Sequence, residues 1–345
     1  MKKAVFILVL LVFCVSLGAS QAAAGPKYKW KLSAVAPPTE TSSQHFAKFA
    51  EMLKEKSGGD IEVTCYFSSQ LGTGRECFEQ VQQELLDIAT DSYANLVSVT
   101  PAFEPFHLPF LFESREQYLR VWQSPVLKKV IDEKLEKAGL KWFIISTSSP
   151  RQIYTTAKTG KVMKPDDCKG LKWRTSRSPL EVDAVNAWGA SAVSMGWAET
   201  LDALRTGMLQ AHSVPTINAY ANKLWDVTPY VGVLSWQVHG FVGVMNLKQW
   251  NKLPQAIRDM VEEAAEESSK WAVEREIPEL NKGMKIAAEK GINWYTYTDE
   301  QREVFKRIAL TIWDKHQDTC PPDYVDLIKK EAGPVGDTSW GLSWK

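Results

Sequence analysis

The sequence predicts an α/β protein of two domains, and three observations support this class. Extended stretches alternate with helical patterns over residues 30–93, an order that implies parallel strands joined by right-handed crossovers. Residues 141–147 are strongly apolar and β-type, which is typical of a buried strand. From 148 to 165 the chain becomes polar and extended, and new strand-to-helix units follow. This change of character predicts the crossing into a second domain.

The first half is predicted to alternate strands with helices whose apolar side chains share one face. Its predicted elements are strand 30–35, a helix carrying Phe46, Phe49, Ala50 and Leu53 that ends at Gly58-Gly59, strand 61–67, helix 75–86, strand 88–93, and helical residues 113–138 with a new helix starting at Pro125. Glycine favours a helix end and proline a helix start, so both positions suit these boundaries.

Residues 169–215 contain two predicted strand ends, each of which leads into a helix. The first strand ends at Arg174, and the second, 192–195, leads to Trp197. The following helix is closed by Gly207. Because ligands of open α/β sheets lie at the carboxyl ends of strands, Arg174 and Trp197 are predicted to lie at a binding site. An arginine guanidinium offers a planar fork of donors that matches a carboxylate.

The last part of the chain is predicted to be mainly helical. Residues 241–245 form a predicted strand that returns to the first domain. A long helical pattern runs from 254 to 290 with Pro278 inside it, where we expect a kink and not an end. Two further helices are predicted at 299–316 and 324–331.

These stretches together resemble the substrate-binding proteins of TRAP transporters, the DctP-type family of periplasmic receptors for organic acids. The resemblance covers nearly the whole chain after the N-terminal segment. It is carried by the strand ending in Arg174, by Trp197, and by the segments 67–72 (FSSQLG, followed by Arg75-Glu76) and 108–112 (LPFLF). It implies a two-domain periplasmic binding protein fold, each domain a mixed sheet flanked by helices, with the long helix spanning both domains.

The domain bounds that we expect are 26–148 plus 240–279 for domain I and 149–239 plus 280–345 for domain II. The resemblance implies a ligand site between the domains, with Arg174 as the carboxylate-binding arginine and Trp197 as the pocket aromatic. Further candidate contacts, each with a structural alternative such as a surface ion pair, core packing or helix capping, are Arg151, Val214, Trp236, Ser92 and Tyr93. Val214 stands where the family usually has an asparagine.

Val214 suggests something about the ligand, because an apolar side chain cannot pair with a buried ligand oxygen. With indoles on the other walls, the sequence predicts a carboxylate with an aromatic or apolar body. The expected function is an extracytoplasmic solute receptor that delivers an organic acid to the membrane permease subunits of a TRAP transporter. We expect a monomer. Two alternatives remain, namely an exported enzyme acting on a carboxylate and a ligand-sensing receptor for a membrane kinase.

Composition and short motifs exclude several other classes. The 345 residues carry a formal net charge of +0 and are 24% charged, which disfavours a nucleic-acid-binding protein. We find no signature of a catalytic residue, no metal-ligand spacing and no cofactor loop, so none of these is expected. Lys2-Lys3, an apolar run from Ala4 to Leu17 and small residues through Ala24 predict a signal peptide over 1–24, cleaved near Ala24. The protein is therefore expected in the periplasm.

Four cysteines remain after that segment, namely Cys65, Cys77, Cys168 and Cys320. An even number in an oxidising compartment permits disulfides, and four cysteines allow three pairings. We expect a Cys65–Cys77 disulfide, because a strand and the next helix could close that loop. Buried free thiols are the alternative, and a Cys168–Cys320 pair stays open.

Overall fold

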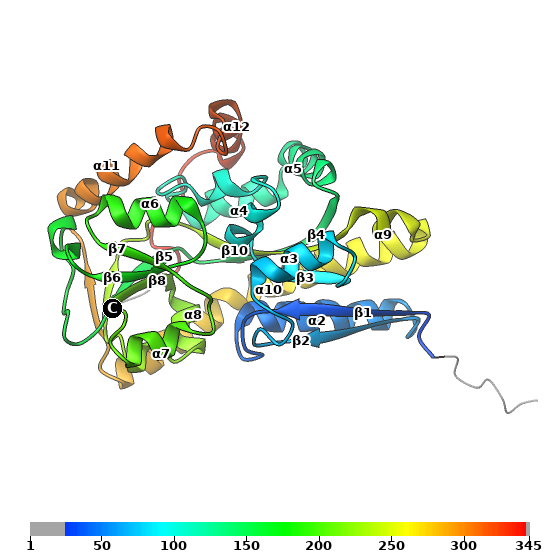
Figure 1. Ribbon diagram of the computed structural model, residues 1–345, viewed down its shortest axis with the longest axis horizontal. Helices are drawn as coiled ribbons and strands as arrows, with labels where there is room; N and C mark the ends of the chain where they lie inside the picture. The colour runs from blue at the N-terminus through cyan, green and yellow to red at the C-terminus, as the bar shows by residue number, and fades with distance from the viewer. Residues whose placement is uncertain (1–24, 343–345) are drawn as a thin grey trace, which may run out of the picture.

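The computed structural model describes residues 25–342, and within them the chain forms two α/β halves side by side (Figure 1). The first half contains a sheet of five strands in the order β2-β1-β3-β10-β4 among the described residues. Its strands are β1 (Tyr28–Ala34), β2 (Ile61–Tyr66), β3 (Ile88–Ser92), β4 (Leu140–Ser148) and β10 (His239–Asn246). The second half, counted over the same residues, contains six strands in the order β11-β9-β5-β8-β6-β7. Its strands are β5 (Arg151–Thr155), β6 (Lys172–Thr175), β7 (Ser191–Ser194), β8 (Ala211–Pro215), β9 (Tyr230–Val233) and β11 (Asn293–Thr296).

Both sheets are mixed, as predicted. In the first sheet β1 runs parallel to β2 and β3, whereas β10 runs antiparallel to β3 and β4. In the second sheet β6 runs parallel to β7 and β8, whereas β5 runs antiparallel to β8 and β9. Because β10 is antiparallel to β3 and β5 is antiparallel to β8, each begins at the end of its sheet where that neighbour ends.

Helices flank each sheet. In the first half these are α2 (Thr41–Lys56), α3 (Gly74–Gln82), η1 (Tyr93–Ser98), η2 (Glu104–His107), α4 (Arg115–Gln123), α5 (Pro125–Lys137) and α9 (Leu247–Lys252). In the second half they are η3 (Pro165–Cys168), α6 (Pro179–Ala187), α7 (Thr200–Arg205), α8 (Thr216–Ala221) and η4 (Leu224–Asp226). The serine before α4 and the serine before α5 accept hydrogen bonds from the first turn, which explains two adjacent helices where the sequence has Pro125.

The long helix α10 (Gln255–Glu289) connects the halves. It packs against α2 and β4 of the first half and against α8 of the second. As predicted, it does not end at Pro278, which lies within the helix. Among the described residues, no helix has both the length and the apolar character needed to cross a membrane.

Two short crossings join the sheets next to one another. Residues 149–150 lead from β4 into β5, and residues 234–238 lead from β9 into β10. The crossings are bonded together, because Arg151 N donates to Gln237 O at 2.8 Å and Trp236 N donates to Arg151 O at 3.4 Å. The N–H of Phe110, in the LPFLF segment, donates to Trp236 O at 2.6 Å. The segment therefore supports the junction between the halves.

The last helices differ from the domain assignment made from the sequence. Helix α11 (Asp299–Lys315) packs against α6 of the second half, whereas α12 (Pro322–Ala332) packs against α4 and α5 of the first. The bounds expected from the sequence assign both helices to domain II, and these bounds remain a prediction. The predicted signal peptide, 1–24, lies outside the described residues.

The expected Cys65–Cys77 disulfide is not formed. All four cysteines of the described chain are free thiols, and Cys77, Cys168 and Cys320 are buried. Cys77 instead lies within hydrogen-bonding distance of Gly72 O, at 3.7 Å. Burial raises the pKa of Cys65 to about 11 and that of Cys168 to about 12, so both stay protonated near neutral pH.

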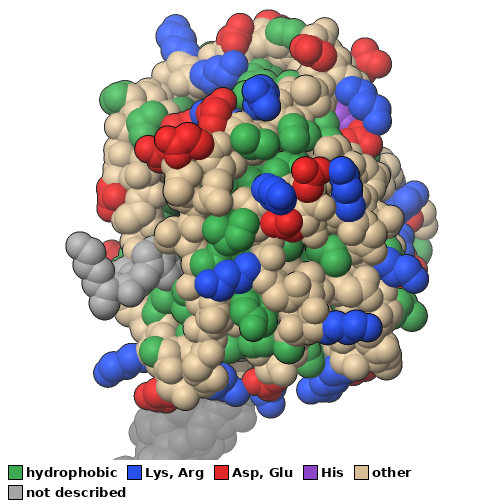
Figure 2. Space-filling model, turned by 90° about the vertical axis from the view of Figure 1, so that its left-hand side faces the viewer, with side chains coloured by type: hydrophobic (Ala, Val, Ile, Leu, Met, Phe, Trp, Pro, Cys, Tyr) green, Lys and Arg blue, Asp and Glu red, His purple; other side chains and the backbone are tan. Residues whose placement is uncertain are grey.

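The end of the molecule formed by the second half is shown in Figure 2. Basic and acidic side chains intermingle over this face, and neither sign gathers into a patch. The local charge distribution therefore matches the balanced composition of the chain.

Candidate functional site

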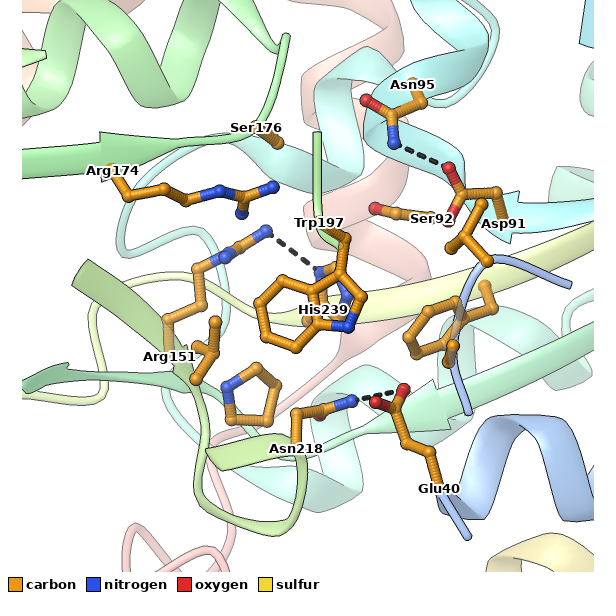
Figure 3. A pocket seen from close by; sticks show the side chains of 15 residues that line it. Glu40, Asp91, Ser92, Asn95, Arg151, Arg174, Ser176, Trp197, Asn218 and His239 are labelled. Carbon is orange, nitrogen blue, oxygen red and sulfur yellow. Dashed lines mark hydrogen bonds between the residues drawn. The ribbon is translucent and has the colours of Figure 1, made fainter. Parts of the chain in front are cut away.

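A cavity of about 430 Å³ lies between the two halves, at the edge where the strands of both sheets meet. The first half contributes the ends of β1 and β3 and the start of β10. The second contributes β6, the end of β8 and the start of β5. The cavity is lined by Val35, Ala36, Glu40, Asp91, Ser92, Asn95, Arg151, Arg174, Ser176, Trp197, Val214, Pro215, Asn218, His239 and Phe241 (Figure 3).

Arg174 combines burial with free hydrogen-bonding capacity. Its side chain is 5% exposed, and its guanidinium Nη2 donates to Met195 O at 3.0 Å. The Nε of Arg174 is buried and has no hydrogen-bond partner among the described residues. Burial lowers the pKa of Arg174 to about 10, so the guanidinium still carries its charge at neutral pH. A buried cation with a free donor is suited to receive an anion.

Arg151 lies beside Arg174 but is already held by the protein (Figure 3). Its guanidinium donates from Nη1 to Ser213 O at 2.7 Å and from Nη2 to His239 Nδ1 at 3.1 Å. Glu181, which is fully buried on α6, places Oε1 3.4 Å from Arg151 Nη1. Arg151 is thus paired with Glu181 inside the protein, whereas Arg174 forms no salt bridge among the described residues, so its charge is available to an anionic ligand.

The ring of Trp197 forms the side of the cavity next to Arg174. The guanidinium carbon of Arg174 lies 5.3 Å from the ring centroid, within cation–π range. The indole Nε1 donates to Asn222 Oδ1 at 3.2 Å, which orients the ring. Val214 and Phe241 add apolar surface to the same cavity.

Acidic and amide side chains of the first half lie opposite the arginines. Burial raises the pKa of Glu40 to about 7 and that of Asp91 to about 6. Asp91 Oδ2 accepts from Asn95 Nδ2 at 2.6 Å, and Glu40 Oε1 accepts from Asn218 Nδ2 at 2.7 Å (Figure 3). This wall therefore presents oxygen acceptors to the space that the arginines face.

The structure brings five of the seven candidate contacts to the cavity, all within the described chain. These are Arg151, Arg174, Trp197, Val214 and Ser92.

The other two candidates, Trp236 and Tyr93, do not line the cavity. Trp236 is fully buried and packs edge-on against Trp188 at 4.9 Å, as part of the crossing between β9 and β10. Tyr93 is buried among aromatic rings, with its hydroxyl 3.2 Å from that of Tyr118. Both positions follow a strand end, but their large apolar rings are buried in the core.

Sequence reasoning missed the polar residues that complete the cavity. They are Glu40, Asp91, Asn95, Ser176, Asn218 and His239. Glu40 and Asp91 follow the strand-end rule that selected Arg174, because Glu40 lies in the loop after β1 and Asp91 is the next-to-last residue of β3. Ser, Asn and Asp in short loops are also typical of helix caps and turns, so the sequence did not distinguish the cavity residues from capping residues. Among residues 25–342, no cluster of three or more His, Cys, Asp or Glu could hold a metal ion.

A second cavity of about 480 Å³ adjoins the first. The two share Arg174, Trp197, Asp91 and lining residues near them. The adjoining space is bordered by α3 of the first half and by the segment 195–199 of the second.

Comparison with protein families gives a match to the model of the bacterial extracellular solute-binding protein, family 7, over residues 32–319. The chain is also similar to the C4-dicarboxylate-binding periplasmic protein DctP of Rhodobacter capsulatus. The two are 26% identical over 301 residues, which cover 87% of this chain and 89% of that protein.

Solved structures of similar fold include two with bound sugar acids. The sugar acid binding protein DctPAm of Advenella mimigardefordensis, in complex with galactonate, has a TM-score of 0.84 and 22% identity, covering 90% of this chain and 99% of that one. A TRAP periplasmic solute binding protein of a Sulfitobacter species, with bound β-D-galacturonate, has a TM-score of 0.82 and 20% identity, covering 88% and 99%. These similarities show the two-domain fold.

Proposed function

Because the chain belongs to the bacterial extracellular solute-binding proteins of family 7, we propose that it is the receptor of a TRAP transporter and delivers an organic acid to the membrane permease. The acid binds in the cavity between the two halves. The family is one of solute-binding proteins, so an enzymatic role is not needed to explain the site. Closure of the halves around the acid gives the permease a loaded form to recognise.

The observation that carries this proposal is the unsatisfied guanidinium of Arg174. Among the described residues its guanidinium makes one hydrogen bond, from Nη2 to Met195 O, and its buried Nε has no partner, while the carboxylate of Glu181 forms its ion pair with Arg151. A ligand carboxylate would supply the missing acceptors, each charge-assisted bond contributing about 1.5–3 kcal/mol. The role of Arg151 is to hold the cationic end of the cavity in place.

We propose that the body of the acid has one apolar face and several hydroxyl groups. The apolar face lies on the Trp197 indole, next to Val214. The hydroxyls reach the acceptors opposite the arginines, where Asp91, Asn95 and Asn218 line the cavity. A sugar acid has this two-sided character, and the two structures of similar fold cited above hold galactonate and β-D-galacturonate.

A second candidate is the acid with an aromatic or apolar body that the sequence predicts. Val214 and Phe241 favour it, because both are apolar and line the cavity. Such a ligand would stack on Trp197 and leave the acceptors of the first half to water. It differs from the first candidate only in the body of the molecule, since both use Arg174 for the carboxylate.

Isothermal titration against four acids separates these candidates. We expect D-galacturonate and D-galactonate to bind at least tenfold more tightly than succinate, a C4-dicarboxylate, and 3-phenylpropionate. Tightest binding of 3-phenylpropionate would instead support the aromatic-body candidate. Failure of all four to bind, together with no response in a wider thermal-shift screen of organic acids, would refute the receptor proposal.

The remaining features of the proposal concern export and partners. The segment 1–24 is removed near Ala24 and the protein acts in the periplasm as a monomer. Mass spectrometry of the exported protein and size-exclusion chromatography with light scattering test these statements. A receptor that signals to a membrane kinase would bind the same acid, so reconstitution with the permease in vesicles, and uptake of labelled acid, distinguishes transport from sensing.

A further inference from the structure

Glu40 joins the two halves through contacts that the proposed ligand does not need. It precedes α2 in the first half, and its carboxylate reaches α8 of the second half. Asn218 Nδ2 donates to Oε1 of Glu40 at 2.7 Å, and Asn222 Nδ2 donates to Oε2 at 2.5 Å. The two asparagines are four residues apart, so they lie on the same side of the helix. One carboxylate thus receives two amides across the cleft.

Most of the accepting capacity of Glu40 is used by these contacts. Ser42 Oγ also donates to Oε1 at 2.9 Å, from within the first half. A carboxylate has about four acceptor positions, and three of them are therefore occupied by protein donors. Glu40 is 1% exposed and lines the cavity, yet its oxygens point at asparagines and a serine. Its bonds fit a structural contact better than ligand recognition.

The same contacts extend to the aromatic wall of the cavity. Asn222 accepts from the Trp197 indole through Oδ1, at 3.2 Å, while its Nδ2 donates to Glu40. The amide of Asn222 cannot be flipped without losing both bonds, because each end has a partner of fixed polarity. The orientation of Trp197 and the position of Glu40 are therefore linked through a single side chain.

We propose that Glu40, Asn218 and Asn222 form an interdomain latch, which holds the closed form and couples closure to the position of the Trp197 ring. Glu40 is a positioning residue in this scheme, since it acts on bound acid through Asn222 and Trp197. The inference rests on the proposed receptor function, because closure matters only if a ligand is enclosed. It adds residues and a direction of coupling that this function does not itself specify.

A swap of polarity between Glu40 and Asn222 tests the latch. In Glu40→Gln, an amide nitrogen replaces one of the two carboxylate oxygens. Where this nitrogen faces Asn222 Nδ2, two hydrogen-bond donors meet. In Asn222→Asp, two carboxylates face each other. The double variant Glu40→Gln/Asn222→Asp restores a donor opposite an acceptor, keeps the net charge, and leaves an oxygen to accept from Trp197.

The measurements are the Kd for D-galacturonate by titration and the radius of gyration of the saturated protein by X-ray scattering. We expect each single variant to bind at least tenfold more weakly and to be less compact, and the double variant to return to within about threefold of the wild-type Kd, at roughly 1.4 kcal/mol per tenfold. Ser42→Ala, which removes a Glu40 bond inside one half, is the matched control and should stay within about threefold.

Two results would overturn the latch. One is single variants that bind and scatter like the wild type. The other is a double variant whose loss equals the product of the single losses, because independent sites show no rescue. The urea unfolding midpoint of the same four proteins is a readout without ligand, and it should fall in each single variant and recover in the double. If no acid binds the wild type, the receptor proposal fails, while this midpoint series still decides whether the interdomain bonds exist.

Discussion

The two walls of the cavity differ in how fully their charged groups are already paired. On the second half, the guanidinium of Arg174 has one hydrogen-bond or ion-pair partner within the described chain, Met195 O, whereas that of the neighbouring Arg151 has three, namely Ser213 O, His239 and Glu181. On the first half, Glu40 receives three protein donors, and Asp91 receives Asn95. Each wall thus has one charged group with several protein partners, Arg151 or Glu40, and one with fewer, Arg174 or Asp91.

This difference distinguishes residues that bind the ligand from residues that stabilise the fold. Burying a charge is costly unless the charge is paired. A charged group with several protein partners therefore supports the fold, whereas one with few partners is available to a ligand. By this criterion we expect Arg151 and Glu40 to support the fold, and Arg174 and Asp91 to contact the ligand. Substitutions that remove one member of each kind should therefore affect different measurements.

Arg151→Ala should have the largest effect, and it should act on stability. The substitution leaves the fully buried Glu181 carboxylate without its cation and removes the donors of Ser213 O and His239. Breaking such a buried pair costs about 3–5 kcal/mol of unfolding free energy. Chemical denaturation measures this loss. A variant as stable as the wild type would show that Arg151 does not support the fold.

Arg174→Ala should act mainly on affinity. It removes two charge-assisted bonds to the acid, about 3–6 kcal/mol together, which corresponds to a rise in Kd of about 100-fold to 10,000-fold. Its effect on stability should be smaller than that of Arg151→Ala, because burial without a full set of partners already disfavours this charge.

Arg174→Lys keeps the charge without the fork and should lie between wild type and alanine. Arg177→Ala, at an exposed arginine bordering only the adjoining cavity, is a control for general electrostatics. If Arg174→Ala and Arg177→Ala weaken binding equally, the anchor is misassigned.

The pH dependence of the unfolding free energy should show how much the buried, ionised carboxylate of Glu40 destabilises the fold. Its pKa is raised by burial from the usual 4.5 to about 7. The folded state therefore binds a proton more tightly than the unfolded chain, and the stability contributed by Glu40 increases as pH falls from about 8 to about 5. The buried histidines oppose this trend, since the pKa of His45 and of His212 is lowered by burial to about 3.

Comparison with Glu40→Gln cancels these histidines. The difference in unfolding free energy between wild type and Glu40→Gln should shift in favour of the wild type by about 2 kcal/mol between pH 8 and pH 5. Urea titrations at a series of pH values measure this difference. A difference independent of pH would mean that Glu40 titrates as an exposed carboxylate.

Val214→Asn should have the smallest effect. The amide would add one donor beside the ligand carboxylate, where the family usually has an asparagine. A single added bond to a charged group contributes about 1.5–3 kcal/mol, much of which is offset by burying the amide, so Kd should improve about threefold to tenfold. Titration with succinate and D-galacturonate measures it, and weaker binding of both acids would mean that Val214 packs against the ligand.

The comparison of the walls also explains what could be predicted from the sequence. The wall of the second half was found because Arg174 and Trp197 follow strand ends and belong to a recognisable motif. The wall of the first half was missed, since Glu40 and Asn218 acquire their meaning only when two distant segments meet across the cleft. The fold was predictable for a related reason, because alternating strands and helices leave a local periodic pattern.

Tertiary packing decided the remaining positions. Trp236 and Tyr93 follow strand ends as Arg174 does, but each ring is surrounded by other aromatic rings. Nothing in the local sequence distinguishes an aromatic side chain that lines a cavity from one that fills a core. The sequence also could not predict that the four cysteines are free thiols, because disulfide formation depends on distances between segments and not on spacing along the chain.

The two bonded crossings between the sheets place Arg151 at the pivot of the molecule. Its backbone belongs to the junction, through bonds to Gln237 and Trp236, while its side chain reaches the cavity floor. Close to a rotation axis, a small displacement corresponds to a large angle, and the outer rims of the two halves then travel much further. A small shift of the guanidinium pair toward a bound anion would therefore correspond to a large change in the opening angle.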